Sequence, residues 1–338
     1  MDLSLSEEQE QLRSSFRSLF DRECDVECVR SAEPLGFAPE LWKRVVELGA
    51  ADMAVPEVAG GAGATLLDAA VISETIGEFV APVPVVETIV ANRLLARLGT
   101  DLALVTLSDA IDLGSVMTVA LSRPVDGELR WVPAGAVAEG VIVADGERVL
   151  VLTDRPPERA VANLASLPLA HRSAHGAQVV ATGAHAAAAF RAAVDEWRVL
   201  TAAVLWGAGR RALDIAIAYA KERKAFGVPI ATYQSVAHRM ADLATALEGS
   251  RLLNRKAAWV AEGQPDQAGR LALMAYAFAG ETAEQAATDS LHFHGGYGFM
   301  LEYDIQLYFR RIKGWSLLNG DPRRELQRLA DVMWGPPG

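Results

Sequence analysis

The sequence predicts a mainly α-helical protein with a small β domain in the middle of the chain. Apolar residues recur at helical spacing from Leu3 to about Leu107, and again from Ala184 onward. Between these stretches, from Gly114 to about Gly183, short β-branched runs replace the helical period. We therefore expect three domains: a helical domain over residues 1–110, a β domain over 111–183 and a helical bundle over 184–338.

The composition indicates a folded protein and argues against several functional classes. The chain has 338 residues, of which 51% are hydrophobic and 22% charged, so it can bury a large core. Its net charge of −11 argues against a nucleic-acid binder, which needs a basic face to neutralise phosphates. No apolar run approaches the roughly 20 residues that span a bilayer. We expect a cytoplasmic protein that binds no nucleic acid and does not insert into a membrane.

The chain contains only two cysteines, Cys24 and Cys28, which are four positions apart in a segment of helical pattern. A structural zinc site needs about four ligands, and no nearby histidine or further cysteine completes a set. We expect two reduced thiols and no metal site.

The first domain begins with a helix whose start and apolar face are both visible in the sequence. Ser6 and Gln9 form a capping box, and apolar positions follow at helical spacing: Leu12, Phe16, Leu19 and Phe20. Proline and glycine in PEVAGGAG, residues 56–63, predict a loop. Helical patterns resume from Ala69 to Leu98.

The middle and last domains differ in the period of their apolar residues. In VIVADGERVLVLT, Asp145 and Gly146 stand between two apolar runs and predict a hairpin turn. Beyond the β segment, three long stretches have the helical period, and they cover residues 186–224, 236–262 and 269–293.

Five motifs follow one another along the chain. They are LWKRVVELGA (41–50), VPEVAGGAG (55–63), APVP (81–84), ERKAFGVPIATYQ (222–234) and HFHGGYGF (292–299). In order and spacing this set resembles the flavin-dependent acyl-CoA dehydrogenase family. The resemblance covers nearly the whole chain. It implies a helical N-terminal domain, a β-barrel-like middle domain and a C-terminal four-helix bundle.

The resemblance implies that FAD is the cofactor and that its site is completed by a neighbouring chain. Glycines in HFHGGYGF would let the backbone approach a dinucleotide closely. The arginine of the other C-terminal motif, Arg223 here, would pair with pyrophosphate, a role that suits a guanidinium because it presents several fixed donors. The predicted FAD contacts are Arg223, Phe226, Gln234, His292, Gly295 and Gly296.

The sequence departs from the family pattern at several flavin contacts. His292 stands where glutamine is usual, although an imidazole can still donate a hydrogen bond. Ala225 removes one polar contact. The middle domain lacks the Thr-Glu-Pro motif, and WVPAGAVAEG (131–140) resembles short bacterial members. We therefore expect this chain to contact the isoalloxazine ring less than a typical member does.

The family's chemistry requires a carboxylate base in a desolvated cleft, where burial raises its pKa. Asn319 occupies the commonest position of this base, and Asp321 lies two residues further on. In a second group of members the base is on the long helix, where Trp197 stands here beside Glu196. Asp321 is thus one candidate base and Glu196 the alternative. Asp321 can equally be the N-cap of a helix that begins at Pro322.

Two functions follow from the resemblance. In the first, the chain is an enzyme of lipid metabolism that oxidises a fatty or sterol side-chain acyl-CoA to the 2,3-enoyl-CoA and passes electrons to an electron-transfer flavoprotein. In the second, it is a catalytically degenerate subunit that completes the flavin site of a partner. The expected assembly is accordingly a homo-oligomer or a heterotetramer with a second acyl-CoA dehydrogenase-like chain. Flavin oxidase or monooxygenase chemistry has no supporting motif.

Overall fold

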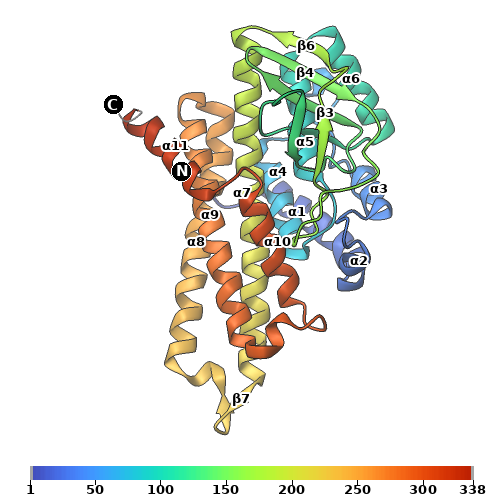
Figure 1. The fold of residues 1–338 in the computed structure, drawn as a ribbon. Coiled ribbons are helices and arrows are strands. Elements are labelled where there is room, and N and C mark those ends of the chain that lie inside the picture. Colours follow the sequence, from blue (N-terminus) through green and yellow to red (C-terminus); the bar gives the residue numbers. More distant parts are fainter. Residues whose placement is uncertain (1–2, 336–338) are drawn as a thin grey trace. The chain divides into compact units, whose positions relative to one another are not determined.

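A computed structural model describes residues 3–335, and the chain divides into two compact units (Figure 1). We call residues 21–69 and 82–200 the sheet unit, and residues 1–20, 70–81 and 201–338 the bundle unit. Three of the four boundaries fall within helices, namely α1 (Glu7–Glu23), α4 (Leu66–Phe79) and α7 (Ala184–Glu222), and the fourth lies in the loop after α4. The three domains expected from the sequence are a different division of the chain and stay a prediction.

Two of the helices of the sheet unit, α2 (Val26–Ser31) and α6 (Asp101–Leu113), begin at residues whose side chains accept a free backbone N–H. Other helices of this unit are α3 (Pro39–Glu47) and α5 (Val85–Leu98), with a short 3₁₀ turn, η1 (Glu57–Ala59), in the predicted loop. Asp25 caps α2 by accepting the Cys28 N–H at 2.8 Å, and Thr100 caps α6 in the same way. Pro39 begins α3, where a missing N–H costs nothing.

The strands of the sheet unit lie within the segment predicted to be β. One sheet has the order β1-β3-β4-β6 and consists of β1 (Met117–Val119), β3 (Gly140–Asp145), β4 (Arg148–Thr153) and β6 (Gln178–Thr182). Strands β2 (Glu128–Val132) and β5 (Ala170–Ser173) form a separate antiparallel pair. The predicted hairpin is confirmed, since Asp145 pairs with Arg148 across a turn in which Gly146 has a φ of 64°.

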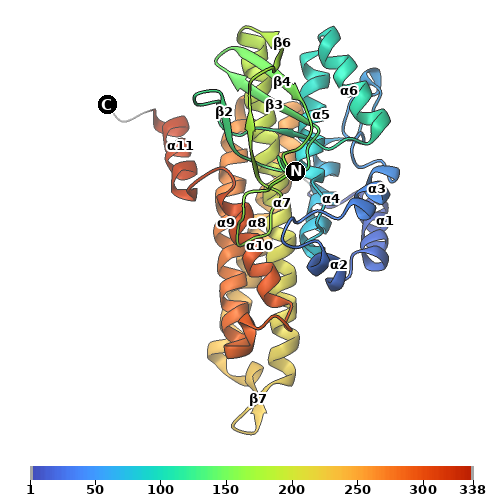
Figure 2. The ribbon, with the colours of Figure 1, turned by 45° about the vertical axis from the view of Figure 1, so that its right-hand side comes forward.

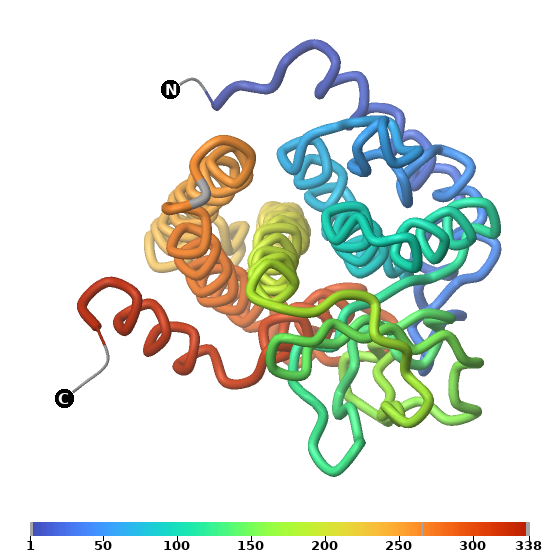
Figure 3. Tube along the Cα trace, turned by 90° about the horizontal axis from the view of Figure 1, so that it is seen from above, coloured from blue at the N-terminus to red at the C-terminus, as the bar shows by residue number. Residues whose placement is uncertain are grey.

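The bundle unit contains the long helices of the C-terminal half. They are the second part of α7, then α8 (Gln234–Gly263), α9 (Pro265–His294), α10 (Ile305–Leu317) and α11 (Pro322–Trp334). Figures 2 and 3 show α7, α8 and α9 running side by side, which confirms the predicted helical bundle. A core cluster around Trp206 includes Leu213, Leu243, Leu247 and Ala286.

Short elements that bear on function lie at one end of this bundle, where α7 and α9 both end. After α7 the chain turns through the hairpin of β7 (Lys224–Ala225) and β8 (Val228–Pro229), then through η2 (Ile230–Thr232) into α8 (Figure 2). After α9, the glycine-rich motif forms the 3₁₀ turn η3 (Gly295–Phe299).

A buried ion pair joins α4 to α8 within the bundle unit. The guanidinium of Arg255 donates from Nε and from one terminal nitrogen to the two carboxylate oxygens of Glu74, each at 3.0 Å. Both side chains are buried. Two parallel charge-assisted bonds fix the relative position of the helices more specifically than apolar packing does.

The described residues contain neither a candidate membrane-spanning helix nor a candidate metal site. Over residues 3–335, no helix combines the length and apolar character needed to cross a bilayer. Within the same residues, no group of three or more His, Cys, Asp or Glu side chains is arranged to hold a metal ion. Cys24 and Cys28 are free thiols.

Candidate functional site

A pocket of about 220 Å³ lies in the bundle unit where the last turn of α7 meets the end of α9. It brings together four residues that the sequence predicts to contact FAD, although one of them is about 70 positions from the others: Arg223, His292, Gly295 and Gly296. Its other lining residues are Tyr219, Ile230, Phe293, His294 and Tyr297. Two motifs far apart in sequence therefore form one site.

The glycines leave the floor of this pocket without side chains. Gly295 has φ 61° and ψ −140°, a conformation that residues with a Cβ adopt rarely. A Cβ added at Gly295 or Gly296 would meet no protein atom within 4 Å. Packing within the protein therefore does not explain why these two positions are glycine. The bare backbone is available to a ligand that lies against it.

Arg223 adds a positive charge beside these glycines. Its backbone is fixed, because its N–H donates to the Tyr219 carbonyl and its carbonyl accepts from Ile230, each at 2.8 Å. Its side chain is exposed and has no hydrogen-bond or ion-pair partner among the described residues. A guanidinium without a carboxylate partner beside bare backbone is suited to the pyrophosphate of a dinucleotide.

The two histidines of the glycine-rich motif have different environments. His292 is exposed at the pocket. His294 is buried, its Nδ1 lies 2.7 Å from the Ser290 carbonyl oxygen, and its ring stacks on Tyr219 at a centroid distance of 4.2 Å. His294 thus packs the end of α9, which leaves His292 as the imidazole available to a ligand.

Phe226 and Gln234 do not line this pocket. Phe226 is 99% exposed at the turn of the β7–β8 hairpin, with a φ of 52°. Gln234 is exposed at the first position of α8. Their contact with FAD stays a prediction. Because both side chains are exposed, they are available to a ligand or to a neighbouring chain.

Asp321 caps a helix, as one of the two interpretations of the sequence predicts. Its Oδ1 accepts the backbone N–H of Arg323 at 2.9 Å, and Pro322 occupies the first helical position. Asn319, in the commonest position of the family's base, donates instead to the buried carboxylate of Glu325 at 3.0 Å. The cap is confirmed, and a role of Asp321 as base stays a prediction.

Glu196 is held by two arginines of α5 in the sheet unit. Arg93 donates to both carboxylate oxygens, at 3.1 and 3.2 Å, and Arg97 donates to one of them. Burial alone would raise the pKa of Glu196, but the two guanidiniums outweigh it and hold that pKa below its ordinary value. A carboxylate fixed in this way is a poor proton acceptor. The next residue, Trp197, is fully buried.

One carboxyl group with unusual properties escaped the sequence analysis. Burial raises the pKa of Glu87, on α5, to about 7, and the nearby indole of Trp197 opposes this only in part. The clue in the sequence is a single glutamate in the apolar run PVVETIV, but a lone charge of this kind usually faces solvent. Only the packing of α5, which buries the residues on both sides of Glu87 in the sequence, distinguishes this glutamate.

Family comparisons agree with the motifs that form this site. Residues 6–103 match the acyl-CoA dehydrogenase N-terminal domain, and residues 185–333 match the acyl-CoA dehydrogenase C-terminal domain. The chain belongs to the acyl-CoA dehydrogenase family. The predicted fold class, helical with a small central β region, is therefore confirmed by both the structure and the family.

Individual relatives cover the chain almost completely. Acyl-CoA dehydrogenase IpdE2 from Mycolicibacterium smegmatis is 32% identical over 96% of this chain and 98% of its own. The structure of the Tcur3481-Tcur3483 steroid ACAD is 29% identical, with a TM-score of 0.87 over 98% of each chain. A glutaryl-CoA dehydrogenase from Mycobacterium smegmatis in complex with FADH₂ shares the fold, with 17% identity and a TM-score of 0.82 over 99% of this chain and 96% of that one. Acyl-CoA dehydrogenases of this fold thus bind flavin.

Proposed function

We propose that this chain is a subunit of an FAD-dependent acyl-CoA dehydrogenase, which converts an acyl-CoA to the 2,3-enoyl-CoA and passes electrons to an electron-transfer flavoprotein. The observation that carries the proposal is the pocket formed by Arg223, His292 and the two glycines. In this proposal the guanidinium pairs with the FAD pyrophosphate, the imidazole donates a hydrogen bond, and Gly295 and Gly296 allow close backbone approach. FAD, when bound, supplies the acceptor for the hydride.

The state of the candidate bases favours a heteromeric enzyme. Asp321 is engaged as a helix cap, Glu196 is fixed by two arginines, and Trp197 fills the position where a second group of members has its base. We therefore propose that the carboxylate that removes the substrate proton belongs to a second acyl-CoA dehydrogenase-like chain in a heterotetramer. The relative named Tcur3481-Tcur3483, after two components, supports this assembly.

A self-sufficient homo-oligomer is the second candidate. It is favoured by the exposure of Asp321 and by its position next to Gly320, whose φ of 95° shows a turn that only glycine adopts readily. In that case Asp321 is the base.

The substrate proposed for either assembly is the CoA thioester of a sterol-derived or fatty acyl group. The name steroid ACAD, borne by a relative 29% identical to this chain, favours the sterol-derived class. The cytoplasmic location stays a prediction.

Flavin titration of the two-chain complex that carries Arg223→Ala tests the cofactor site. Loss of a charge-assisted hydrogen bond at an exposed position should weaken FAD binding about tenfold, or about 1.4 kcal/mol. Arg324→Ala is the matched control, because Arg324 is also exposed and also has no side-chain partner among the described residues. Equal FAD affinity in the two variants would remove Arg223 from the site.

Coexpression with a homologous second chain tests the assembly. The proposal predicts that flavin content and acyl-CoA oxidation appear only when both chains are present, in a complex of defined stoichiometry. Full activity of this chain alone would contradict the heteromeric proposal and favour the homo-oligomer.

A further inference from the structure

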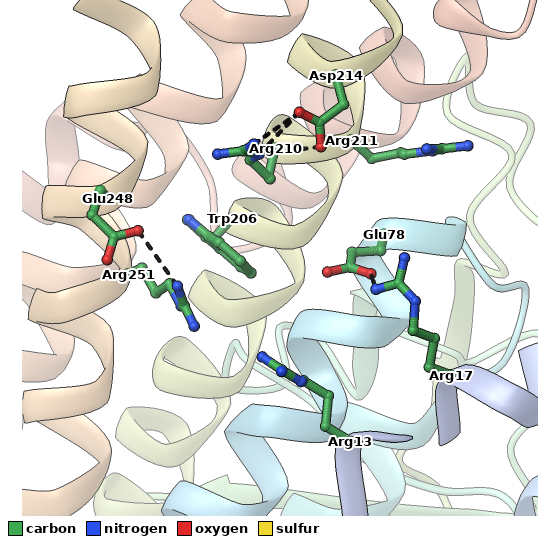
Figure 4. A pocket seen from close by; sticks show the side chains of 9 residues that line it. All are labelled: Arg13, Arg17, Glu78, Trp206, Arg210, Arg211, Asp214, Glu248 and Arg251. Atoms are coloured by element: carbon green, nitrogen blue, oxygen red, sulfur yellow. Dashed lines mark hydrogen bonds and ion pairs between the residues drawn. The ribbon is translucent and has the colours of Figure 1, made fainter. Parts of the chain in front are cut away.

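Two pockets of the bundle unit differ in how their polar groups are satisfied. One, of about 230 Å³, is lined by side chains of α1, α4, α7 and α8 (Figure 4). Its carboxylates pair with arginines of the same lining: Glu78 with Arg17, Asp214 with Arg210 and Glu248 with Arg251. That pocket is an ion-pair network. The other is the candidate flavin site, where the buried side chain of His294 has a ring nitrogen without a partner among residues 3–335.

The ring of His294 is held in place by contacts within the bundle unit. Its Nδ1 lies 2.7 Å from the Ser290 carbonyl oxygen. Tyr219 stacks on the ring at a centroid distance of 4.2 Å and an interplanar angle of 23°, and Tyr303 makes a T-shaped contact with it at 6.2 Å. These three contacts fix the orientation of the imidazole, and therefore the direction in which its second nitrogen, Nε2, points.

The bond at Nδ1 determines the chemistry of Nε2. A carbonyl oxygen can only accept a hydrogen bond, so Nδ1 of His294 carries the proton that is shared with Ser290. In the neutral imidazole the lone pair is then on Nε2, which becomes a hydrogen-bond acceptor. Within the described part of the chain, Nε2 has no donor.

The Nε2 atom reaches the candidate flavin site. His294 is only 3% exposed, yet it is one of the residues that line this pocket. Nε2 is not among the side-chain atoms that are both sealed from solvent and without a hydrogen bond. Because it has no hydrogen bond, it belongs to the small part of the ring that stays accessible. A buried side chain held in one orientation thus presents a single acceptor to the pocket, although His292 is the more exposed imidazole of the motif.

This acceptor complements the charge of Arg223 in the same lining. A guanidinium can only donate, and it suits a phosphate group. Nε2 of His294 can only accept in the neutral ring, and it suits a hydroxyl or an amine. A ligand that satisfies both groups carries a phosphate and, apart from it, an O–H or N–H donor. An adenine nucleotide has this combination, since its ribose hydroxyls and its exocyclic amine are donors.

We propose that Nε2 of His294 accepts a hydrogen bond from the adenosine half of the bound dinucleotide and makes the site selective for it. The inference rests on the proposed function, in which that dinucleotide is FAD. The donor is a ribose hydroxyl or the adenine amine, which offer the same chemistry to an imidazole acceptor. His294 is then a specificity-determining residue of the cofactor site as well as part of the packing at the end of α9.

Calorimetric titration with ADP tests the inference in the flavin-free protein, in whichever of the two proposed assemblies the chain forms. ADP has the phosphates and all of the candidate donors but no flavin ring. In 2′-deoxy-ADP, 3′-deoxy-ADP and inosine diphosphate, one donor each is missing. One of these analogues should bind about three- to tenfold more weakly than ADP, because it loses one neutral hydrogen bond. The analogue that loses affinity identifies the donor as a hydroxyl or as the amine.

Two substitutions of His294 separate ligand binding from packing. In His294→Asn, the side-chain amide can still donate to the Ser290 carbonyl, but no acceptor remains at the place of Nε2. In His294→Gln, the longer side chain brings an amide oxygen to that place and loses the bond to Ser290. The asparagine variant should bind ADP about three- to tenfold more weakly and no longer distinguish it from the analogue, whereas the glutamine variant should retain both properties in part.

The opposite order of the two variants would overturn the inference. If His294 only packs the end of α9, the asparagine variant, which keeps the bond to Ser290, binds ADP at least as tightly as the glutamine variant. Equal affinity of the unsubstituted protein for ADP and all three analogues would overturn it as well, and this comparison requires no substitution to fold. Arg223→Ala identifies a failure of the proposed function instead: if ADP does not bind, or binds equally well without the guanidinium, the cofactor site itself is wrong.

Discussion

Single carboxyl groups in this chain differ mainly in what surrounds them. Glu74 and Glu196 are buried and paired with arginine, whereas Asp321 is exposed and engaged as a helix cap. Glu87 caps no helix, and no arginine is among the groups that shift its pKa. Burial raises that pKa to about 7. A carboxyl group with such a pKa is often functional.

Replacement of Glu87 by Gln should stabilise the protein at pH 8. The unfolded chain loses this proton near pH 4.5, but the folded protein retains it to about pH 7, so native stability falls as the pH rises between these values. At about 1.4 kcal/mol for each pKa unit, the cost above pH 7 reaches up to about 3 kcal/mol. Denaturant unfolding of the Glu87→Gln variant and of the unsubstituted protein, at pH 5 and at pH 8, measures this difference in unfolding free energy. A difference in free energy that does not grow with pH would show that Glu87 is solvated.

Two substitutions of Asp321 separate its roles as cap and base. Asparagine caps helices as well as aspartate does, so Asp321→Asn should leave stability nearly unchanged, while Asp321→Ala should lose about 1 kcal/mol. If a partner chain supplies the base, Asp321→Asn also keeps full activity in the complex. Thermal unfolding and flavin reduction by an acyl-CoA measure the two effects. Loss of activity in Asp321→Asn without loss of stability would identify Asp321 as the base.

At the scale of elements, sequence patterns predict what depends on neighbours along the chain. The helical period predicts the bundle helices, and Asp145 with Gly146 predicts the β3–β4 hairpin, because both signals are local. The motifs likewise predict that Arg223 and Gly295 share a site. The Arg255–Glu74 pair, by contrast, joins residues 181 positions apart. Such a pair leaves no periodic signal, since burial and partners are decided only by tertiary packing.

Arg255→Ala tests how strongly α4 and α8 depend on their ion pair. The substitution leaves the buried Glu74 carboxylate with Arg251, at 3.6 Å, as its remaining ion-pair partner among residues 3–335, and should destabilise the protein by about 3 to 5 kcal/mol. The control Arg130→Ala removes an exposed pair with Glu128 and should change the unfolding free energy little. Urea unfolding of the two variants and of the unsubstituted protein measures both changes in the unfolding free energy. A small effect of Arg255→Ala would mean that water reaches Glu74 or that Arg251 replaces the lost partner.

At the scale of the whole molecule, exposed apolar side chains indicate how the chain assembles. Leu326, Val332, Met333 and Trp334 on α11 are exposed, and so is Phe226 at the hairpin turn. Phe226 has a positive φ, which is unfavourable for a bulky residue and indicates that its position is maintained for a purpose. Exposed apolar side chains of this kind are typical of surfaces that become buried when subunits associate.

Phe226→Ser should therefore weaken assembly and reduce flavin content without unfolding the chain. Phe226 is 99% exposed, so its removal costs no packing within this fold, and any loss must come from contacts with another chain or with FAD. Val58→Ser is the matched control, because Val58 is also 99% exposed but is on η1 of the sheet unit and belongs to neither C-terminal motif. Light scattering and flavin absorbance of the purified complexes measure both effects, while circular dichroism checks the fold. If Phe226→Ser assembles and binds flavin as the Val58→Ser protein does, the hairpin does not reach a neighbouring subunit, and FAD would have to be held by Arg223 and the glycine turn without it.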